Sequence, residues 1–183
     1  MYCEKYKKSL EEQTVDALLG RNWEITTVES CTGGAVAARI VNVPGASDVL
    51  KEGYITYCDA AKMKLAGVRR ETLEAYTAVS RQTAEEMALG GIRASGADVA
   101  LAVTGLAGPG GGTEERPVGL VYVGCAVHER VTVKELHLKG SRKEIRDQAA
   151  DEALKLALEC ILPVSYTHLV TESEGNCILS PRK

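Results

Sequence analysis

One short stretch of the chain, Asp98 to Thr104, is almost wholly apolar and runs straight into a glycine-rich loop, Gly105 to Thr113. A run without a polar face predicts a strand covered on both sides, since a strand with one face in water alternates apolar and polar residues. Such strands belong to sheets that carry helices on both faces. The rest of the chain therefore has to supply helices for two layers.

Other segments alternate between strand-like and helix-like patterns. Further strands are predicted at 23–28, 53–57, 118–127 and 130–138, with His128 and Glu129 forming a hairpin turn between the last two. Helices are predicted at 2–20, after Gly34, at 59–66, from the cap Ser80 to Ser95, and from the capping-box pair Ser141 and Glu144 to about residue 162. This order predicts a three-layer α/β/α sandwich around a mixed, mostly parallel sheet of about five strands.

Length and composition fit one ordinary globular domain. The chain has 183 residues, of which 45% are hydrophobic and 26% charged, with a formal net charge of −3. Lysine and arginine are dispersed among acids, which argues against nucleic-acid binding. No apolar run approaches the roughly 20 residues that span a bilayer, and no signal peptide is recognisable, so we expect a cytoplasmic protein without membrane contact.

The last residues differ in character from the rest. The segment 164–169 looks like the translation of a library adapter, and the residues after it show no periodicity. We therefore expect a domain at 1–162 and a non-native or disordered tail at 163–183; a genuine flexible tail is the alternative. We expect the domain to form a homo-oligomer, a dimer. We also expect it to bind a small-molecule substrate.

Cysteine and histidine spacing gives no metal or redox motif. The six cysteines form no CxxC pair, and the three histidines stand at neither HExxH nor HxH spacing. We therefore expect neither a bound metal nor a cofactor.

Two glycine turns follow strands and are candidate anion sites. In the first, Ser30 and Thr32 carry hydroxyls, and Gly33 and Gly34 lead into a helix whose first amides lack internal partners. The second turn lies after the apolar strand, where open α/β sheets usually bind ligands, and it has neither a Walker motif nor GxGxxG in register. A plain tight turn and a plain surface loop are the alternatives. Together the turns suggest a phosphorylated small molecule, held by Thr32, Gly33, Gly34, Thr104, Gly105, Gly108, Gly110 and Gly111.

A nucleophile with a basic partner is available between the two turns. Ser47, Tyr57 and Lys62 lie in this stretch, and a lysine with a pKa lowered by desolvation can accept a serine proton. Taken singly, such residues are more often structural. A serine in a turn is usually a helix cap, and a lysine on a short helix is usually solvated.

Several motifs in order resemble the CinA C-terminal (PncC) family. The motifs are ESCTGG at 29–34, GYITY at 53–57 with Lys62, AVS at 78–80, AVTGLAGPGGG at 102–112 and PVG at 117–119, and the likeness covers about 5–162. The resemblance implies hydrolysis of the carboxamide of nicotinamide mononucleotide to nicotinic acid mononucleotide and ammonia, a step of pyridine-nucleotide salvage. By position it implies Ser47 as nucleophile, Lys62 as base and Tyr57 as a supporting hydroxyl, with Ser30 and Thr104 lining the site.

Two departures from the family pattern bear on this assignment, of which the first is Gly45-Ala46-Ser47 in place of the usual Gly-Ser-Ser. Where relatives often have Ser-Asn-Glu-Ala-Lys, this chain has residues 58–62 as Cys-Asp-Ala-Ala-Lys, and an inward-facing Asp59 would raise the pKa of Lys62. Cys31 and Cys58 are expected to be buried apolar residues rather than nucleophiles. Ser30 remains open as the nucleophile in place of Ser47. Two other functions also remain open: a non-catalytic ligand- or partner-binding module linked to competence or DNA damage, and a hydrolase of another phosphorylated amide.

Overall fold

The computed structural model describes residues 8–162, which form one five-stranded sheet between two layers of helices. The expected tail at 163–183 lies outside the described residues. The strands are β1 (Ile25–Glu29), β2 (Leu50–Ile55), β3 (Val99–Gly105), β4 (Leu120–Val127) and β5 (Arg130–His137). Their order across the sheet is β2-β1-β3-β4-β5.

Strand direction in this sheet is mixed. β1 is parallel to both β2 and β3, while β4 is antiparallel to β3 and to β5. Four strands therefore run the same way and β4 alone runs the other way. This confirms the predicted mixed, mostly parallel sheet and the β4–β5 hairpin, and it adds a second antiparallel pair, β3–β4.

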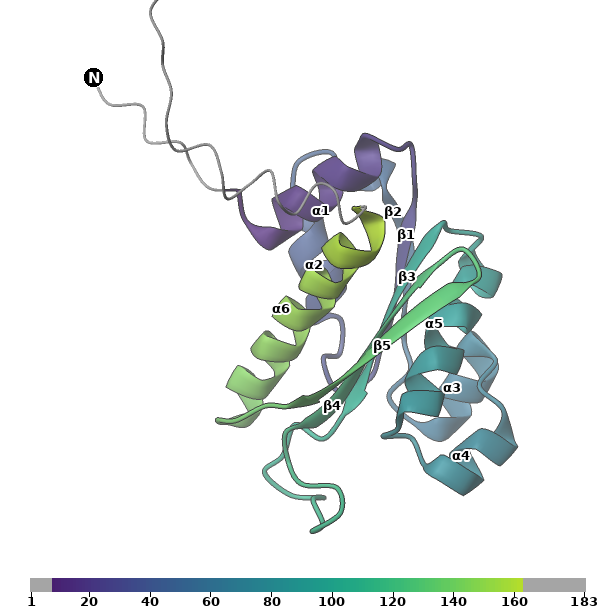
Figure 1. Cartoon of the computed structure of the whole chain (residues 1–183), viewed down its shortest axis with the longest axis vertical. Coiled ribbons are helices and arrows are strands. Elements are labelled where there is room, and N and C mark those ends of the chain that lie inside the picture. The colour runs from purple at the N-terminus through teal and green to yellow at the C-terminus, as the bar shows by residue number, and fades with distance from the viewer. Residues whose placement is uncertain (1–7, 163–183) are drawn as a thin grey trace, which may run out of the picture.

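Helices cover both faces of the sheet. They are α1 (Leu10–Leu19), α2 (Ala35–Val41), α3 (Asp59–Ala66), α4 (Arg70–Tyr76), α5 (Arg81–Ser95) and α6 (Arg142–Ile161), with a 3₁₀ turn η1 at Ala46–Asp48. Figure 1 shows α1, α2 and α6 on one side of the sheet and α3, α4 and α5 on the other. α5 and α6 pack directly on the central strands. α3 and α4 pack against α5, and α1 and α2 pack against α6. The three-layer α/β/α sandwich is thus confirmed.

An apolar core lies on each side of the sheet, and β3 contributes side chains to both cores. Val99, Leu101 and Val103 face the α6 side, and Ala100 and Ala102 face the α5 side. The small residues on the second side let α5 approach closely: a Cβ added at Gly91 of α5 would stand 2.7 Å from a Val28 methyl carbon and 3.2 Å from the Ala100 Cβ. The all-apolar sequence of β3 is therefore explained by burial between two helix layers.

Helix ends agree well with the cap signals in the sequence. Ser80 and Ser141 cap α5 and α6 as predicted, and Gly67 and Gly96 end α3 and α5 in the left-handed conformation. α1 begins at Leu10 because Ser9 and Glu12 form a capping box, which the broader prediction from residue 2 overlooked. α4 was not predicted, since its seven residues carry no side-chain cap and little periodicity.

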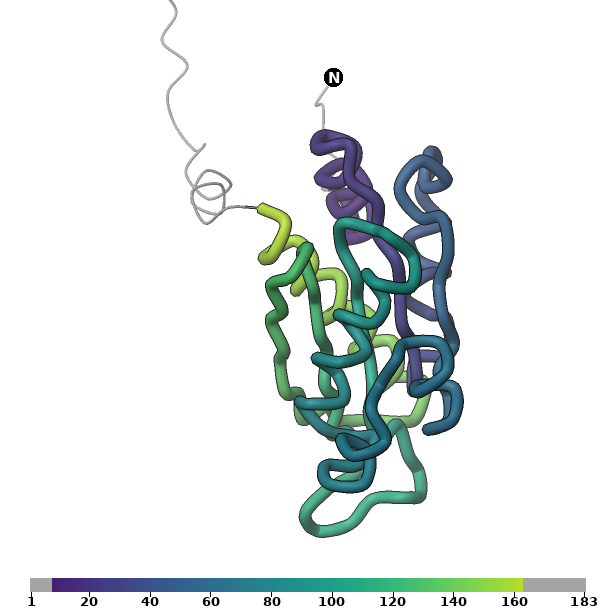
Figure 2. The backbone as a smooth tube through the Cα atoms, turned by 90° about the vertical axis from the view of Figure 1, so that its right-hand side faces the viewer, coloured from purple at the N-terminus to yellow at the C-terminus, as the bar shows by residue number. Residues whose placement is uncertain are grey.

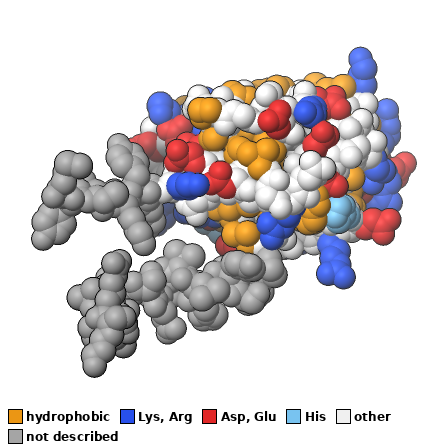
Figure 3. All heavy atoms as spheres, turned by 90° about the horizontal axis from the view of Figure 1, so that it is seen from above, with side chains coloured by type: hydrophobic (Ala, Val, Ile, Leu, Met, Phe, Trp, Pro, Cys, Tyr) orange, Lys and Arg blue, Asp and Glu red, His pale blue; other side chains and the backbone are white. Residues whose placement is uncertain are grey.

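The surface shows mixed charge, and acidic and basic side chains are intermingled on the face seen in Figure 3. Among residues 8–162, every helix falls short of the length and apolarity required to cross a bilayer.

Candidate functional site

The carboxyl ends of the parallel strands β1, β2 and β3 meet at one edge of the sheet and border a cavity. Its volume is about 240 Å³. In Figures 1 and 2 the loop after β3 extends from this lower end of the molecule. The cavity is lined by Ser30, Cys31, Tyr57, Asp59, Lys62, Ala78, Val79, Thr104, Gly105, Leu106, Ala107, Gly108, Gly110 and Arg142.

Lys62, on α3, is buried against this cavity and points its amine at a serine. Its side chain is only 1% exposed, and Nζ donates to Ser30 Oγ at 3.1 Å and to the Thr56 carbonyl at 2.8 Å. Within the described part of the chain, Lys62 has no carboxylate at ion-pair distance. Burial lowers the pKa of Lys62, and the nearby charge of Asp59 opposes this without reversing it. The effect of the Asp59 carboxylate on the pKa of Lys62 thus has the predicted direction, but desolvation of the amine outweighs it.

Ser30 and Ser47 lie at opposite edges of the sheet. Ser30 directly follows β1, whereas Ser47 lies in η1, before β2 begins, where it is exposed and accepts a hydrogen bond from Lys51 through its carbonyl. Because β1 and β2 are parallel, the two serines are separated by the length of a strand, on the order of 15 Å. The predicted pairing of Ser47 with Lys62 is therefore not present, and Ser30 holds that position.

The first glycine turn already contains an anion, and it belongs to the protein. The fully buried Glu29 side chain accepts hydrogen bonds from the amides of Gly34 (2.9 Å), Val36 (3.1 Å) and Ala37 (2.9 Å) at the start of α2. Gly33 and Gly34 have positive φ, which lets the chain fold back over this carboxylate. The amides predicted to hold a substrate anion are occupied, and Thr32, Gly33 and Gly34 do not line the cavity.

Tyr57 and the second loop are joined by Arg142, the first residue of α6. Its guanidinium donates from Nη1 to the Gly108 carbonyl at 2.7 Å and from Nη2 to the Tyr57 hydroxyl at 2.8 Å. Tyr57 lines the cavity, and its hydroxyl accepts from Arg142 rather than contacting the Lys62 amine. Arg142 closes one side of the cavity by linking the segment after β2, α6 and the loop.

The loop after β3 supplies the backbone surface that its glycines predicted. Thr104 Oγ1 donates to the Ala78 carbonyl at 2.6 Å, which fixes the segment before α5 as the opposite wall. Gly105, Gly108 and Gly110 line the cavity, while Gly111 lines an adjoining one. Among the residues that the structure describes, the amides of Ala107, Gly108, Gly110, Gly111 and Gly112 have no hydrogen-bond acceptor.

The two cysteines near the site differ in environment. Cys31 is buried, and burial raises its pKa to about 11, which keeps it a neutral thiol. Cys58 is exposed, so the expectation that it is buried was wrong; it stands at the N-cap of α3 with an extended backbone.

Sequence reasoning missed three contributors to the site: Glu29, Thr56 and Arg142. Thr56 acts through its carbonyl, which any residue could supply. Arg142 is more than 80 positions away from Tyr57 in the chain. Only the role of Glu29 could have been predicted from the sequence. An acid at the buried end of a strand needs hydrogen-bond donors, and the amides of the following helix are the nearest ones.

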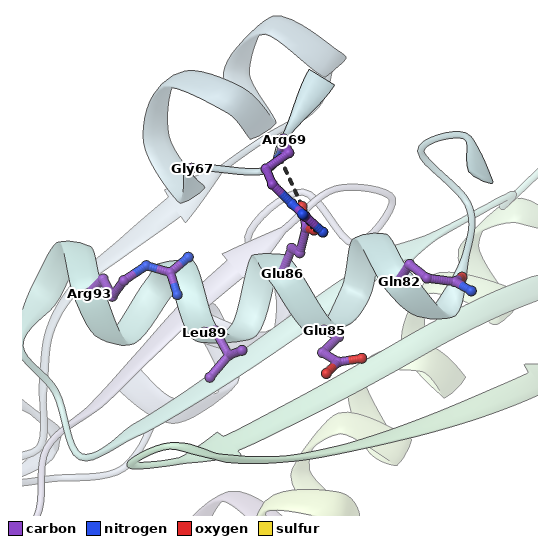
Figure 4. Close-up of a pocket in the computed structure, with 7 residues that line it drawn as sticks. All are labelled: Gly67, Arg69, Gln82, Glu85, Glu86, Leu89 and Arg93. Carbon is purple, nitrogen blue, oxygen red and sulfur yellow. Dashed lines mark hydrogen bonds and ion pairs between the residues drawn. The ribbon is translucent and has the colours of Figure 1, made fainter. Parts of the chain in front are cut away.

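A larger hollow of about 510 Å³ lies elsewhere, between the α3–α4 connection and α5 (Figure 4). An ion pair lies at this hollow, in which Arg69 Nη2 is 2.5 Å from Glu86 Oε1. Glu86 also accepts a hydrogen bond from the Thr72 hydroxyl. These contacts fasten the start of α4 to α5. The hollow contains none of the residues that converge on Lys62.

Solved structures of similar proteins share this architecture. Aligned with the competence/damage inducible protein CihA from Agrobacterium tumefaciens, the chain shows 38% identity and a TM-score of 0.80, with 85% of this chain and 97% of that chain covered. For a competence-damaged protein (CinA) superfamily protein from Escherichia coli the identity is 34% and the TM-score 0.77, over 82% and 90% of the two chains.

Sequence comparison agrees with the structural one. A CinA-like protein from Kosmotoga olearia is 49% identical over 158 residues, which are 86% of this chain and 38% of that protein. The chain thus spans well under half the length of this curated relative. The family described as CinA C-terminal domain matches residues 7–161. On this match and the shared fold, the chain belongs to the CinA C-terminal domain family.

Proposed function

We propose that this protein hydrolyses the carboxamide of nicotinamide mononucleotide, with Ser30 as nucleophile and Lys62 as general base. The observation that carries the proposal is the contact of the buried Lys62 amine with the Ser30 hydroxyl, 3.1 Å apart in a cavity at the carboxyl edge of the sheet. A lysine with a lowered pKa is a competent base for a serine hydroxyl. This choice replaces Ser47, which the resemblance had suggested, and keeps Lys62.

The chemistry would run in two halves. The neutral Lys62 amine takes the Ser30 proton as Oγ bonds to the amide carbon; the carbon–nitrogen bond then breaks, and the Lys62 ammonium returns the proton to the leaving ammonia. Water next attacks the resulting ester with Lys62 again as base, the bond from carbon to Ser30 Oγ breaks, and Ser30 regains its proton. The sum is amide plus water to acid plus ammonia.

A donor for the negative oxygen of the tetrahedral intermediate is at hand. The backbone N–H of the residue after a nucleophile is a common oxyanion donor, and here that residue is Cys31. Among the described residues, the Cys31 amide donates to no carbonyl or carboxylate oxygen, and Cys31 lines the cavity. We therefore propose this amide as a donor to the oxygen of the intermediate.

The choice of a phosphorylated pyridine nucleotide as substrate rests on the family resemblance and on the second loop. The amides of this loop that have no acceptor among the described residues give the cavity surroundings suited to an anion. Neutral nicotinamide alone would leave these donors unused.

The direct test is ammonia release by the purified protein. We expect release from nicotinamide mononucleotide, much slower release from nicotinamide riboside and the slowest from nicotinamide, because only the first offers the phosphate. Ammonia is measured by a coupled dehydrogenase assay and the acid product by chromatography. A melting temperature that rises with the mononucleotide while no ammonia forms would replace the hydrolase with a binding module.

The pKa of Lys62 gives a second test, with a defined direction. Activity should rise with pH through an apparent pKa below the 10.5 of an ordinary lysine, because the neutral amine is the base. The same shift costs stability: the unfolded chain holds the Lys62 proton more tightly, so the penalty is full below the folded-state pKa and fades as pH approaches 10.5. Lys62→Met should therefore be inactive, and its stability relative to the wild type should be greatest near pH 7 and decline as the pH approaches 10.5.

The control for this variant is Lys64→Met, an exposed position on the same helix. It should change neither the pH profile nor the melting temperature appreciably. Equal melting temperatures of Lys62→Met and the wild type across the pH range would contradict a costly buried amine.

A further inference from the structure

A second cavity of about 220 Å³ adjoins the one that contains Ser30 and Lys62. It is lined by Thr77, Ala78, Val79, Leu106, Gly111, Thr113 and Arg116, of which Ala78, Val79 and Leu106 also line the first cavity. Each cavity alone is smaller than the roughly 300 Å³ at which small-molecule sites begin, and the two together fall within the usual range. An elongated ligand would occupy both.

The second cavity carries one charged side chain, Arg116. Its guanidinium is half-buried and donates from Nη1 to the Thr77 hydroxyl at 2.6 Å. Over residues 8–162, no carboxylate lies within 4 Å of this guanidinium, and the neighbouring Glu114 and Glu115 are exposed and line neither cavity. An arginine held in a cavity without an acid is suited to an anionic ligand group.

The backbone beside Arg116 is arranged for the same purpose. A small turn fixes its position: the Thr113 amide donates to the Arg116 carbonyl at 2.8 Å, and the Arg116 amide donates to Thr113 Oγ1 at 3.0 Å. The amides of Gly111 and Gly112 come just before this turn and, among the described residues, have no acceptor. At the other end of the site, Arg142 already uses both outer nitrogens on Gly108 and Tyr57.

The wall between the two cavities is held independently of Arg116. Thr77 has a positive φ of 69°, a strained conformation for a β-branched residue. Its carbonyl accepts hydrogen bonds from the hydroxyls of Ser80 (3.1 Å) and Thr83 (2.7 Å), and Thr104 holds the next carbonyl. Loss of the Arg116 charge should therefore leave the wall in place.

We propose that this second cavity is the phosphate subsite of the enzyme, with Arg116 as the residue that binds the phosphoryl group. The inference rests on the proposed function, since it takes the amide to lie at Ser30. In a mononucleotide the ring amide and the 5′-phosphate are at opposite ends of the molecule. Ser30 and Arg116 lie in two adjoining cavities, so one mononucleotide could place its amide at Ser30 and its phosphate at Arg116. Arg116 is thereby a residue that determines specificity for the phosphorylated substrate over the riboside.

The experiment compares Arg116→Gln with the wild type on nicotinamide mononucleotide and on nicotinamide riboside. Glutamine keeps a polar end group but is shorter than arginine and carries no charge. We expect kcat/KM for the mononucleotide to fall about 10- to 100-fold, mainly through KM, as for the loss of hydrogen bonds to a charged group. Turnover of the riboside should be unchanged. An equal fall on both substrates, or none on the mononucleotide, overturns the subsite.

Three variants separate charge from structure. Arg130→Gln, at the opposite edge of the sheet, is the matched control and should behave as the wild type. Thr77→Ala removes the partner of Arg116 but keeps the charge, so a phosphate-specific loss as large as that of Arg116→Gln would make the role structural. The same phosphate-specific loss in Arg142→Gln, with Arg116→Gln unaffected, would place the phosphate at Arg142 and overturn the proposal.

Failure of the proposed function gives a different result from failure of the subsite. If the wild type releases no ammonia from either compound, the function fails, and thermal shifts then judge the subsite. A stabilisation by the mononucleotide that the riboside does not produce and that Arg116→Gln abolishes supports it. No stabilisation by the mononucleotide, or one that survives in Arg116→Gln, overturns it.

Discussion

Replacing Ser30 with alanine should lower ammonia release from nicotinamide mononucleotide by roughly 10⁴-fold or more, the scale on which enzymes respond to loss of a nucleophile. Under the proposal, Ser30 forms the covalent bond to the substrate, and no other hydroxyl of the described residues contacts Lys62 Nζ. The loss should lie in kcat. The measurement is initial-rate ammonia release, with folding verified by circular dichroism and thermal melting.

Ser47→Ala is the matched control, because it makes the same chemical change at an exposed position at the other edge of the sheet. It should retain activity within about twofold. Were Ser47→Ala inactive and Ser30→Ala active, Ser47 would regain the role that sequence resemblance gave it, and the Lys62–Ser30 contact would be structural.

Glu29→Ala should produce the largest loss of stability of any single change near the site. The substitution leaves three amides of α2 without an acceptor inside the protein and removes three hydrogen bonds to a carboxylate. A buried donor left without an acceptor costs about 1–3 kcal/mol, so three amides together are expected to cost about 3–5 kcal/mol or more. For a domain of this size the expected fall in melting temperature is about 10 °C, measured by differential scanning calorimetry.

Glu29→Gln should fall between Glu29→Ala and the wild type, because its carbonyl oxygen can still accept while its NH₂ group faces amide donors. Glu129→Gln, an exposed glutamate in the β4–β5 turn, is the control and should melt with the wild type. A Glu29→Ala protein as stable as the wild type would mean that water readily replaces the carboxylate at the start of α2.

The fold was predictable because its signals are local. Ser80, Ser141 and Gly67 carry cap chemistry that fixes helix ends, and the apolar run of β3 indicates burial on both faces. The direction of β4 was harder to predict, since a connection of 14 residues between Gly105 and Leu120 could lead back to the sheet as a hairpin or as a crossover. The short helix α4 escaped because its stability comes from tertiary contacts such as Arg69 with Glu86.

The site was predictable only in part. Lys62 and the second loop follow strand ends and Thr104 is the penultimate residue of β3, and the carboxyl edge of a parallel sheet collects such residues. The choice between Ser30 and Ser47 depended on which end of a strand each residue adjoins. The bounds and the shared direction of β1 and β2 decide that choice, and composition does not. The first glycine turn misled because its amides do attract an anion, and the nearest one, Glu29, is the residue that begins the motif.

The reversed direction of β4 makes the site loop the connection of an antiparallel strand pair, β3 and β4. Two hydrogen bonds close its base, Leu106 N–H to the Leu120 carbonyl at 2.9 Å and Gly119 N–H to the Leu106 carbonyl at 2.7 Å. Residues 107–118 can consequently be lengthened, shortened or exchanged between relatives without moving the strands that hold Ser30 and Lys62. Under the proposed function, loop grafting would be a practical route to an altered substrate range, because the residues that recognise the anion could be exchanged while Ser30 and Lys62 stay in place.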